Sequence, residues 1–150
     1  MNWYLNTTSR EIWAYVGKAF SSEECDAIID IGKKIGFTDG KLADGNQVNV
    51  NARKSKVSFL DPKDKSCEWI FRRTTDFVNV INKQFWNFDL SYIEILQFTA
   101  YTQKDDFYTK HTDQNSDTPF YRKLSFSIQL SDPDTYEGSD LLMYISDDHV

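Results

Sequence analysis

The stretch from Lys123 to Leu130 constrains the fold more than any other, because apolar and polar side chains alternate along it. Side chains two positions apart point to the same face of a β-strand, so Tyr121 to Leu130 is predicted to be a strand with one buried face. The apolar face would hold Leu124, Phe126, Ile128 and Leu130, and the polar face Lys123, Ser125, Ser127 and Gln129. The chain must therefore build a sheet and cover one side of it.

Further strands are predicted on both sides of this one in the sequence. Their residues are mostly aromatic, β-branched or aliphatic, and turn residues follow them. These segments are Lys56–Leu60, Ser91–Tyr101, Phe107–Asp113 and Leu141–Ile145. Asp61-Pro62 closes the first of them, and Asp132-Pro133-Asp134 predicts a turn before the last.

Two amphipathic helices are predicted in the first 90 residues. The first begins at Ser21 or Ser22, where a serine with a glutamate three residues later forms a capping box, and it ends at Gly36. The second runs from about Ser66 to Trp86, with a stripe of Ile70, Arg73, Phe77, Val80, Ile81, Gln84 and Phe85. Helices followed by strands indicate one α+β domain over 1–150, with a cover of helices and strands in 1–90 and curled strands in 91–150.

Charge and composition narrow the classes of function. The chain has 17 Lys and Arg against 23 Asp and Glu, a net charge of −6, so nucleic acid is not an expected partner. Cys25 and Cys67 lack the spacing of a zinc site and are interpreted as reduced thiols. With no signal peptide and no membrane-spanning apolar stretch in view, we expect a cytoplasmic protein without a membrane partner.

The pair His111 and Asp113 is the sharpest chemical feature. On a strand, residues two apart share a face, so the imidazole and the carboxylate would project together. They would supply two of the three ligands in the facial triad of non-haem iron(II) enzymes. A surface histidine next to an aspartate at a strand end would explain the same pair, so its neighbours in the sequence decide the interpretation.

Those neighbours carry four further motifs. A strand ending in tyrosine, Leu96–Tyr101, precedes the His-x-Asp segment, and an arginine opens the strand that follows it, Arg122–Ser131. Tyr136–Leu141 reads y-x-G-G-x-L with Ser139 in place of the second glycine, and Arg53-Lys54-Ser55 reads R-x-S. In order and spacing, over roughly two-thirds of the chain, these motifs resemble iron(II)/2-oxoglutarate-dependent oxygenases of the prolyl 4-hydroxylase-like branch.

The resemblance implies a double-stranded β-helix, a cupin-like jelly roll with the N-terminal helices on its larger sheet. It implies that His111 and Asp113 bind Fe(II), that Tyr101 lies beside the cosubstrate 2-oxoglutarate, and that O2 is consumed with ascorbate as reductant. Ser127 and Gln129 would line the cofactor chamber, Gln129 standing where some relatives have a cofactor-binding tyrosine. A core role for Tyr101 and a backbone-satisfying role for Gln129 stay open.

The polar segment from Asp39 to Arg53 is the expected substrate-covering loop, with Asp44, Gly45, Asn46 and Arg53 as its site residues. In the family, a distal histidine and an arginine or lysine follow about two strands after the G-G-x-L motif. Because Val150 ends this sequence first, we expect a domain without its C-terminal strands, with weak iron binding, poor activity and self-association through open sheet edges. His149 falls where the family has a turn and is not assigned to iron.

The function expected by resemblance is a dioxygenase that hydroxylates an amino-acid side chain, a prolyl residue in a peptide or protein. Two alternatives stay open: a non-catalytic jelly-roll module for binding or structure, and an oxygenase acting on a free amino acid or another small molecule. Iron binding with 2-oxoglutarate turnover would exclude the first. An open groove for an extended peptide would argue against the second.

Overall fold

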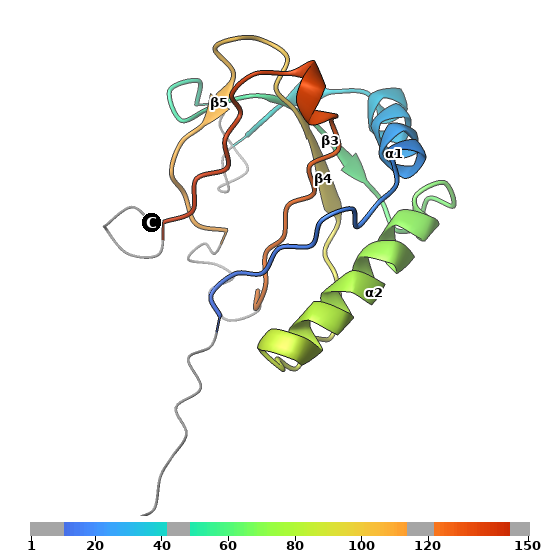
Figure 1. Cartoon of the computed structure of the whole chain (residues 1–150). Helices are drawn as coiled ribbons and strands as arrows, with labels where there is room; N and C mark the ends of the chain where they lie inside the picture. The colour runs from blue at the N-terminus through green and yellow to red at the C-terminus, as the bar shows by residue number, and fades with distance from the viewer. Residues whose placement is uncertain (1–10, 42–48, 114–121, 145–150) are drawn as a thin grey trace, which may run out of the picture.

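The computed structural model describes residues 11–41, 49–113 and 122–144 (Figure 1). These residues form an α+β fold with two α-helices and small antiparallel sheets. In chain order the elements are α1 (Ser22–Ile35), β1 (Thr38–Asp39), β2 (Arg53–Lys54), β3 (Lys56–Leu60), α2 (Glu68–Phe85), β4 (Leu96–Ala100), β5 (Phe107–Tyr108) and the 3-10 turn η1 (Pro133–Thr135). Across the described ranges, neither helix has the length and apolar character needed to cross a membrane.

The strands form two separate sheets. One has three strands in the order β1-β3-β4, and the other pairs β2 with β5. In the larger sheet Ser58 lies opposite Phe98, and in the smaller sheet Arg53 lies opposite Tyr108. Ser55 alone separates β2 from β3, so the chain passes from one sheet to the other within one residue.

Helix α1 forms where its caps predict it. The Ser21 hydroxyl accepts a hydrogen bond of 3.2 Å from the Glu24 amide, and the Glu24 carboxylate accepts one of 2.8 Å from the Ser21 amide. This reciprocal capping box satisfies two amide groups that a helix start otherwise leaves free. At the other end Gly36 has a φ of 93°, which only glycine adopts readily.

Helix α2 lies within two residues of its predicted bounds, but the predicted stripe was wrong in part. Arg73, Val80 and Gln84 are exposed, and the buried face instead carries Ile70, Phe71, Thr74 and Asn82. Asn82 is buried because its side chain closes the segment after the helix. It donates to the Phe88 carbonyl at 2.8 Å and accepts from the Phe88 amide at 2.9 Å. A stripe drawn from hydrophobicity cannot anticipate this polar contact.

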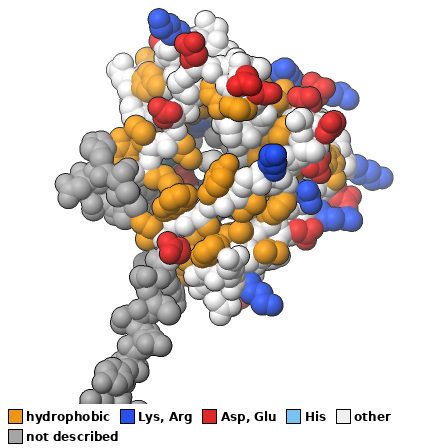
Figure 2. Space-filling view, in the orientation of Figure 1, with side chains coloured by type: hydrophobic (Ala, Val, Ile, Leu, Met, Phe, Trp, Pro, Cys, Tyr) orange, Lys and Arg blue, Asp and Glu red, His pale blue; other side chains and the backbone are white. Residues whose placement is uncertain are grey.

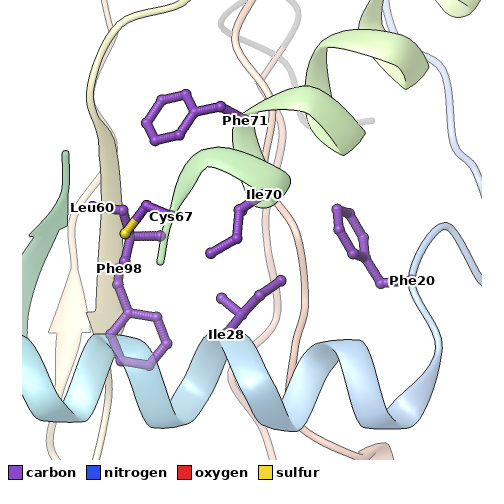
Figure 3. Close-up of a cluster of buried hydrophobic side chains, with 7 residues drawn as sticks. All are labelled: Phe20, Ile28, Leu60, Cys67, Ile70, Phe71 and Phe98. Carbon is purple, nitrogen blue, oxygen red and sulfur yellow. The ribbon is translucent and has the colours of Figure 1, made fainter. Parts of the chain in front are cut away.

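The hydrophobic core lies between the two helices and the strands β3 and β4 (Figure 3). Both helices lie on the same side of the molecule, next to these strands (Figure 1). The buried cluster consists of Phe20, Ile28, Leu60, Cys67, Ile70, Phe71 and Phe98. Cys67 and the half-buried Cys25 are both free thiols, as the sequence predicts.

The segments predicted to be strands after β4 form shorter strands than expected, or form no strand because their backbone does not pair with another strand in the described residues. Phe107–Asp113 pairs only over Phe107–Tyr108, residues 122–130 form no strand, and the 141–144 region contributes a single bridge residue at Tyr144. A strand needs the amide and carbonyl groups of a partner, whereas an alternating pattern specifies only which side chains become buried. The α+β class is therefore confirmed, and the jelly roll stays a prediction.

The alternation in residues 122–130 is nevertheless visible in their burial. Ile128 and Leu130 pack against the core cluster, while Ser125, Ser127 and Gln129 are exposed. Phe126 departs from the pattern, since 42% of it is exposed. Residues 122–144, here called the returning segment, cross a face of the molecule that carries many hydrophobic side chains (Figure 1, Figure 2). Large exposed apolar residues of 122–144 include Phe126, Tyr136, Leu141, Leu142 and Met143.

Candidate functional site

His111 and Asp113 lie just beyond the end of β5, not on the strand that the sequence predicts. The ladder ends with the Thr109 amide, which donates to the Ala52 carbonyl at 2.9 Å. The next residues leave the sheet, so strand pleating does not align the two side chains. They still turn toward each other, and His111 Nε2 lies 3.6 Å from Asp113 Oδ1.

A backbone contact orients the His111 ring. Its Nδ1 atom lies 2.8 Å from the Thr109 carbonyl oxygen. A carbonyl oxygen only accepts hydrogen bonds, so this contact places the proton on Nδ1. In the neutral imidazole the lone pair is then on Nε2, the atom that faces Asp113. Metal-binding histidines are commonly oriented in this way, with the other ring nitrogen donating to a carbonyl or carboxylate.

The separation of the two side chains fits ligands of a common ion. Two donor atoms at about 2.1 Å from one metal lie ~3.0 Å apart at a right angle and ~3.6 Å apart at 120°. The observed 3.6 Å matches the wider angle, so the pair can supply two ligands if the donors move about 0.6 Å closer to reach the right angle of a facial triad. Within the described ranges, no group of three His, Cys, Asp or Glu side chains is arranged to hold a metal ion. His149 lies outside those ranges.

An aromatic and cationic stack supports the histidine. The Tyr108 ring stacks on the His111 ring, with centroids 3.6 Å apart and planes 16° from parallel. The guanidinium carbon of Arg53 lies 4.5 Å from the centre of the Tyr108 ring. Because the imidazole covers one face of Tyr108, the guanidinium must lie over the other, in a cation–π contact. The stack of Arg53, Tyr108 and His111 thereby links β2 and β5 to the candidate metal ligand.

Arg53 was predicted to be a residue of the substrate loop, and the structure places it in a strand. Arg53 lies in β2 and only 4% of it is exposed. Its guanidinium donates to the Ser55 hydroxyl at 2.8 Å, the Lys41 carbonyl at 3.3 Å and the Gln97 side-chain oxygen at 3.4 Å. These neutral acceptors and the Tyr108 ring hold the charge inside the protein. The other predicted loop residues, Asp44, Gly45 and Asn46, lie outside the described residues.

The predicted cofactor-binding residues occupy two different parts of the structure. Tyr101 directly follows β4 and is 45% exposed, and partial burial raises the pKa of its phenol despite the nearby Arg53 charge. Its hydroxyl therefore stays protonated at neutral pH and is available as a donor. Ser127 and Gln129 are exposed on the returning segment, and neither side chain forms a hydrogen bond within the described part of the chain.

A shallow pocket of about 430 Å³ lies beside Asp113. Its lining residues are Thr112, Asp113, Arg122, Lys123, Leu124 and Ser125. Arg122 binds the Glu94 carboxylate through two contacts of 2.7 Å and also donates to the Asp113 carbonyl. The hydrogen bond from Arg122 lowers the pKa of Glu94 below its ordinary value.

Sequence reasoning missed Glu94, Tyr108 and Thr109 as parts of this site. Glu94 is 28 positions from Arg122, and no local pattern connects residues at that separation. Thr109 acts through its backbone carbonyl, which does not depend on residue type. Tyr108 is the last residue of β5 and His111 lies three positions later. A tyrosine and a histidine at this spacing form no motif that would predict their stacking.

Comparison with known proteins gives a distant relationship. No family model matches the chain, and no solved structure matches it. The chain is similar to a PKHD-type hydroxylase of Crocosphaera subtropica, with 27% identity in an alignment of 135 residues that covers 85% of this chain. It spans 57% of that relative's length. The chain is thus similar, at low identity and over part of its length, to a hydroxylase.

Proposed function

We propose that this chain is part of an iron(II)- and 2-oxoglutarate-dependent dioxygenase that hydroxylates an amino-acid side chain, a prolyl residue in a peptide or protein. The observation that carries the proposal is the His111–Asp113 pair, 3.6 Å apart, with His111 Nδ1 bonded to a carbonyl so that Nε2 faces the carboxylate. The similarity to a hydroxylase supports the reaction class. A jelly-roll fold and a cytoplasmic location belong to the same proposal.

Under this proposal each site residue has a defined task. His111 and Asp113 hold Fe(II), and the bound metal supplies the activation of O2 and the oxidation of a C–H bond. The Tyr101 hydroxyl would donate to a carboxylate of 2-oxoglutarate, and burial, which raises the pKa of the phenol above its ordinary value, favours the protonated form that can donate. Ser127 and Gln129 provide polar groups on the exposed side of the returning segment. Ascorbate serves as the reductant.

Anaerobic titration with Fe(II) or Mn(II) tests the metal site directly. His111→Ala and Asp113→Ala should each weaken binding at least tenfold relative to the unmodified chain, because one of two ligands is lost. Asp30→Asn, which changes an exposed acidic residue of α1, is the matched control and should leave binding unchanged. Equal affinity in all four proteins would show that the pair does not bind metal.

Turnover is tested separately by measuring succinate formed from 2-oxoglutarate in the presence of Fe(II), ascorbate and a proline-rich peptide. The chain should form succinate, and His111→Ala should abolish it. Metal binding without any succinate would instead favour a non-catalytic binding module. Succinate formed with a free amino acid but not with the peptide would favour the small-molecule alternative.

A further inference from the structure

We propose that Glu94 and Arg122 are positioning residues that hold the backbone of Asp113 in place for metal binding. The proposal rests on the proposed metal site, but its geometry is independent of any ion. It assigns a task to a carboxylate that sequence patterns do not single out. It also gives the arginine beside the pocket a role that acts through Asp113.

One guanidinium group joins three segments of the chain. Arg122 Nε and Nη2 lie 2.7 Å from the two oxygens of Glu94, which is the bidentate geometry that arginine forms with carboxylates. The remaining nitrogen, Nη1, donates to the Asp113 carbonyl oxygen. Each nitrogen therefore has its own acceptor, and the planar group fixes the positions of these acceptors relative to one another.

Both partners of Asp113 in this contact lie close to segments that pack on the core. Glu94 lies two positions before β4, and β4 is paired along its length with β3 in the three-stranded sheet. Arg122 begins the returning segment, whose Ile128 and Leu130 pack against the core. Asp113, in contrast, lies beyond the end of the β2–β5 ladder and belongs to no regular element. The guanidinium thus links Asp113, which makes no ladder hydrogen bond in β5, to segments that pack on the core, and so restrains its backbone.

The two members of the metal pair are held by different means. Tyr108 stacking and the Thr109 carbonyl orient the His111 ring. Arg122 holds Asp113 through its backbone carbonyl, which leaves the carboxylate free to point at His111 Nε2. Lysine cannot replace Arg122 in this arrangement, because one ammonium group cannot reproduce a planar fork with a third donor.

The proposal is tested with four variants: Arg122→Lys, Arg122→Ala, Glu94→Gln and the double variant Glu94→Gln/Arg122→Ala. The control is Arg72→Ala, which removes the exposed Arg72–Glu68 ion pair of 2.7 Å on α2. Two quantities are measured, the dissociation constant for Mn(II) and the backbone order parameters of Thr112 and Asp113 by ¹⁵N relaxation without metal. Thermal unfolding of each variant checks that it is folded.

We expect Mn(II) binding to weaken about tenfold in the three single variants, the usual scale for residues that orient a ligand. The double variant should bind no more weakly than Arg122→Ala, because both changes break the same contact. Order parameters at Thr112 and Asp113 should fall toward the ~0.6 of flexible backbone from the ~0.85 of rigid backbone. Arg72→Ala should change neither quantity.

Failure of this proposal and failure of the metal site give different results. Unchanged metal affinity in Arg122→Ala and Glu94→Gln, with loss in His111→Ala, would overturn the positioning role and leave the metal site intact. Metal affinity that is insensitive to His111→Ala would overturn the metal site, and with it the role of Arg122 in metal binding. Unchanged order parameters in Arg122→Ala would show that the guanidinium does not hold Asp113 at all. Glu94→Gln preserves the shape of the side chain, so it tests the contact even if Arg122→Ala does not fold.

Discussion

The ring of Phe98 fills the space beside Gly32 in which a larger residue would place its side chain. A Cβ atom on Gly32 would lie 2.5 Å from the ring Cδ1 atom and 2.6 Å from Cγ. On the neighbouring strand, Ser58 donates a buried hydrogen bond of 2.9 Å to the Gly32 carbonyl. Helix α1 therefore approaches the sheet closely here because position 32 has no side chain.

Gly32→Ala should destabilise the fold by about 1–2 kcal/mol, because overpacking outweighs the roughly 1 kcal/mol that alanine gains over glycine inside a helix. Urea unfolding measures the change. Gly17→Ala is the control, since the nearest atom to its Cβ would be an ordinary 3.5 Å away. Greater stability of Gly32→Ala would show that Phe98 moves aside freely.

Asn82→Ala should lower the free energy of unfolding by about 1–3 kcal/mol. The substitution leaves the Phe88 amide and carbonyl without the side chain that binds both, at 2.9 and 2.8 Å. Chemical denaturation gives the value, with Asn79→Ala on the exposed side of the same helix as the control. Helix propensity alone favours alanine over asparagine, so Asn79→Ala should be neutral or slightly stabilising. The same result at position 82 would mean that the contact with Phe88 contributes little.

Tyr108→Ala should weaken Mn(II) binding several-fold, because the His111 ring loses the surface on which it stacks. Tyr108→Phe keeps the ring and should bind metal like the unmodified chain. Tyr108→Ala should also reduce stability by about 1–2 kcal/mol, since the buried Arg53 charge loses its cation–π partner. Titration and urea unfolding of both variants check this. A loss in Tyr108→Phe as large as in Tyr108→Ala would assign the effect to the hydroxyl.

The Glu94–Arg122 pair predicts a component of stability that depends on pH. The hydrogen bond from Arg122 lowers the pKa of Glu94 from 4.5 in the folded protein, so the pair stabilises the fold above that pH. This contribution is lost as the pH falls below 4.5 and through the lower pKa that Glu94 has in the folded protein. The Glu94 side chain is 46% exposed, which limits the effect to about 1 kcal/mol. Glu94→Gln should therefore be less stable than the unmodified chain at pH 6, and urea unfolding at successively lower pH should show the difference shrinking below pH 4.5. A difference that persists in acid would contradict the electrostatic explanation.

The sequence predicts those features that depend on neighbouring residues. Ser21, Glu24 and Gly36 define the ends of α1 through contacts within one turn, and all three act as predicted. The strand Lys56–Leu60 also has its predicted bounds. In both cases the residues that specify the element lie inside it or directly beside it.

Features that depend on a contact outside the regular element itself were not predictable. Asn82 lies on the buried face of α2 because its side chain binds the backbone of Phe88. Arg53 is buried because Gln97 and Tyr108, which lie on other strands, contact its guanidinium group. The pairing of Glu94 with Arg122 is of the same kind. The proximity of His111 and Asp113 was predicted from strand pleating, but it arises in a segment that has left the strand.

The single residue between β2 and β3 limits where this chain can tolerate insertions. Ser55 is buried, its hydroxyl accepts from Arg53, and its carbonyl accepts from the Gly40 amide at 2.9 Å. One added residue beside it would shift β2 by one position and turn the Arg53 side chain to the opposite face. A peptide tag or a fluorophore-bearing loop should therefore be placed at Asp89 or Ser91, which are exposed and belong to no regular element.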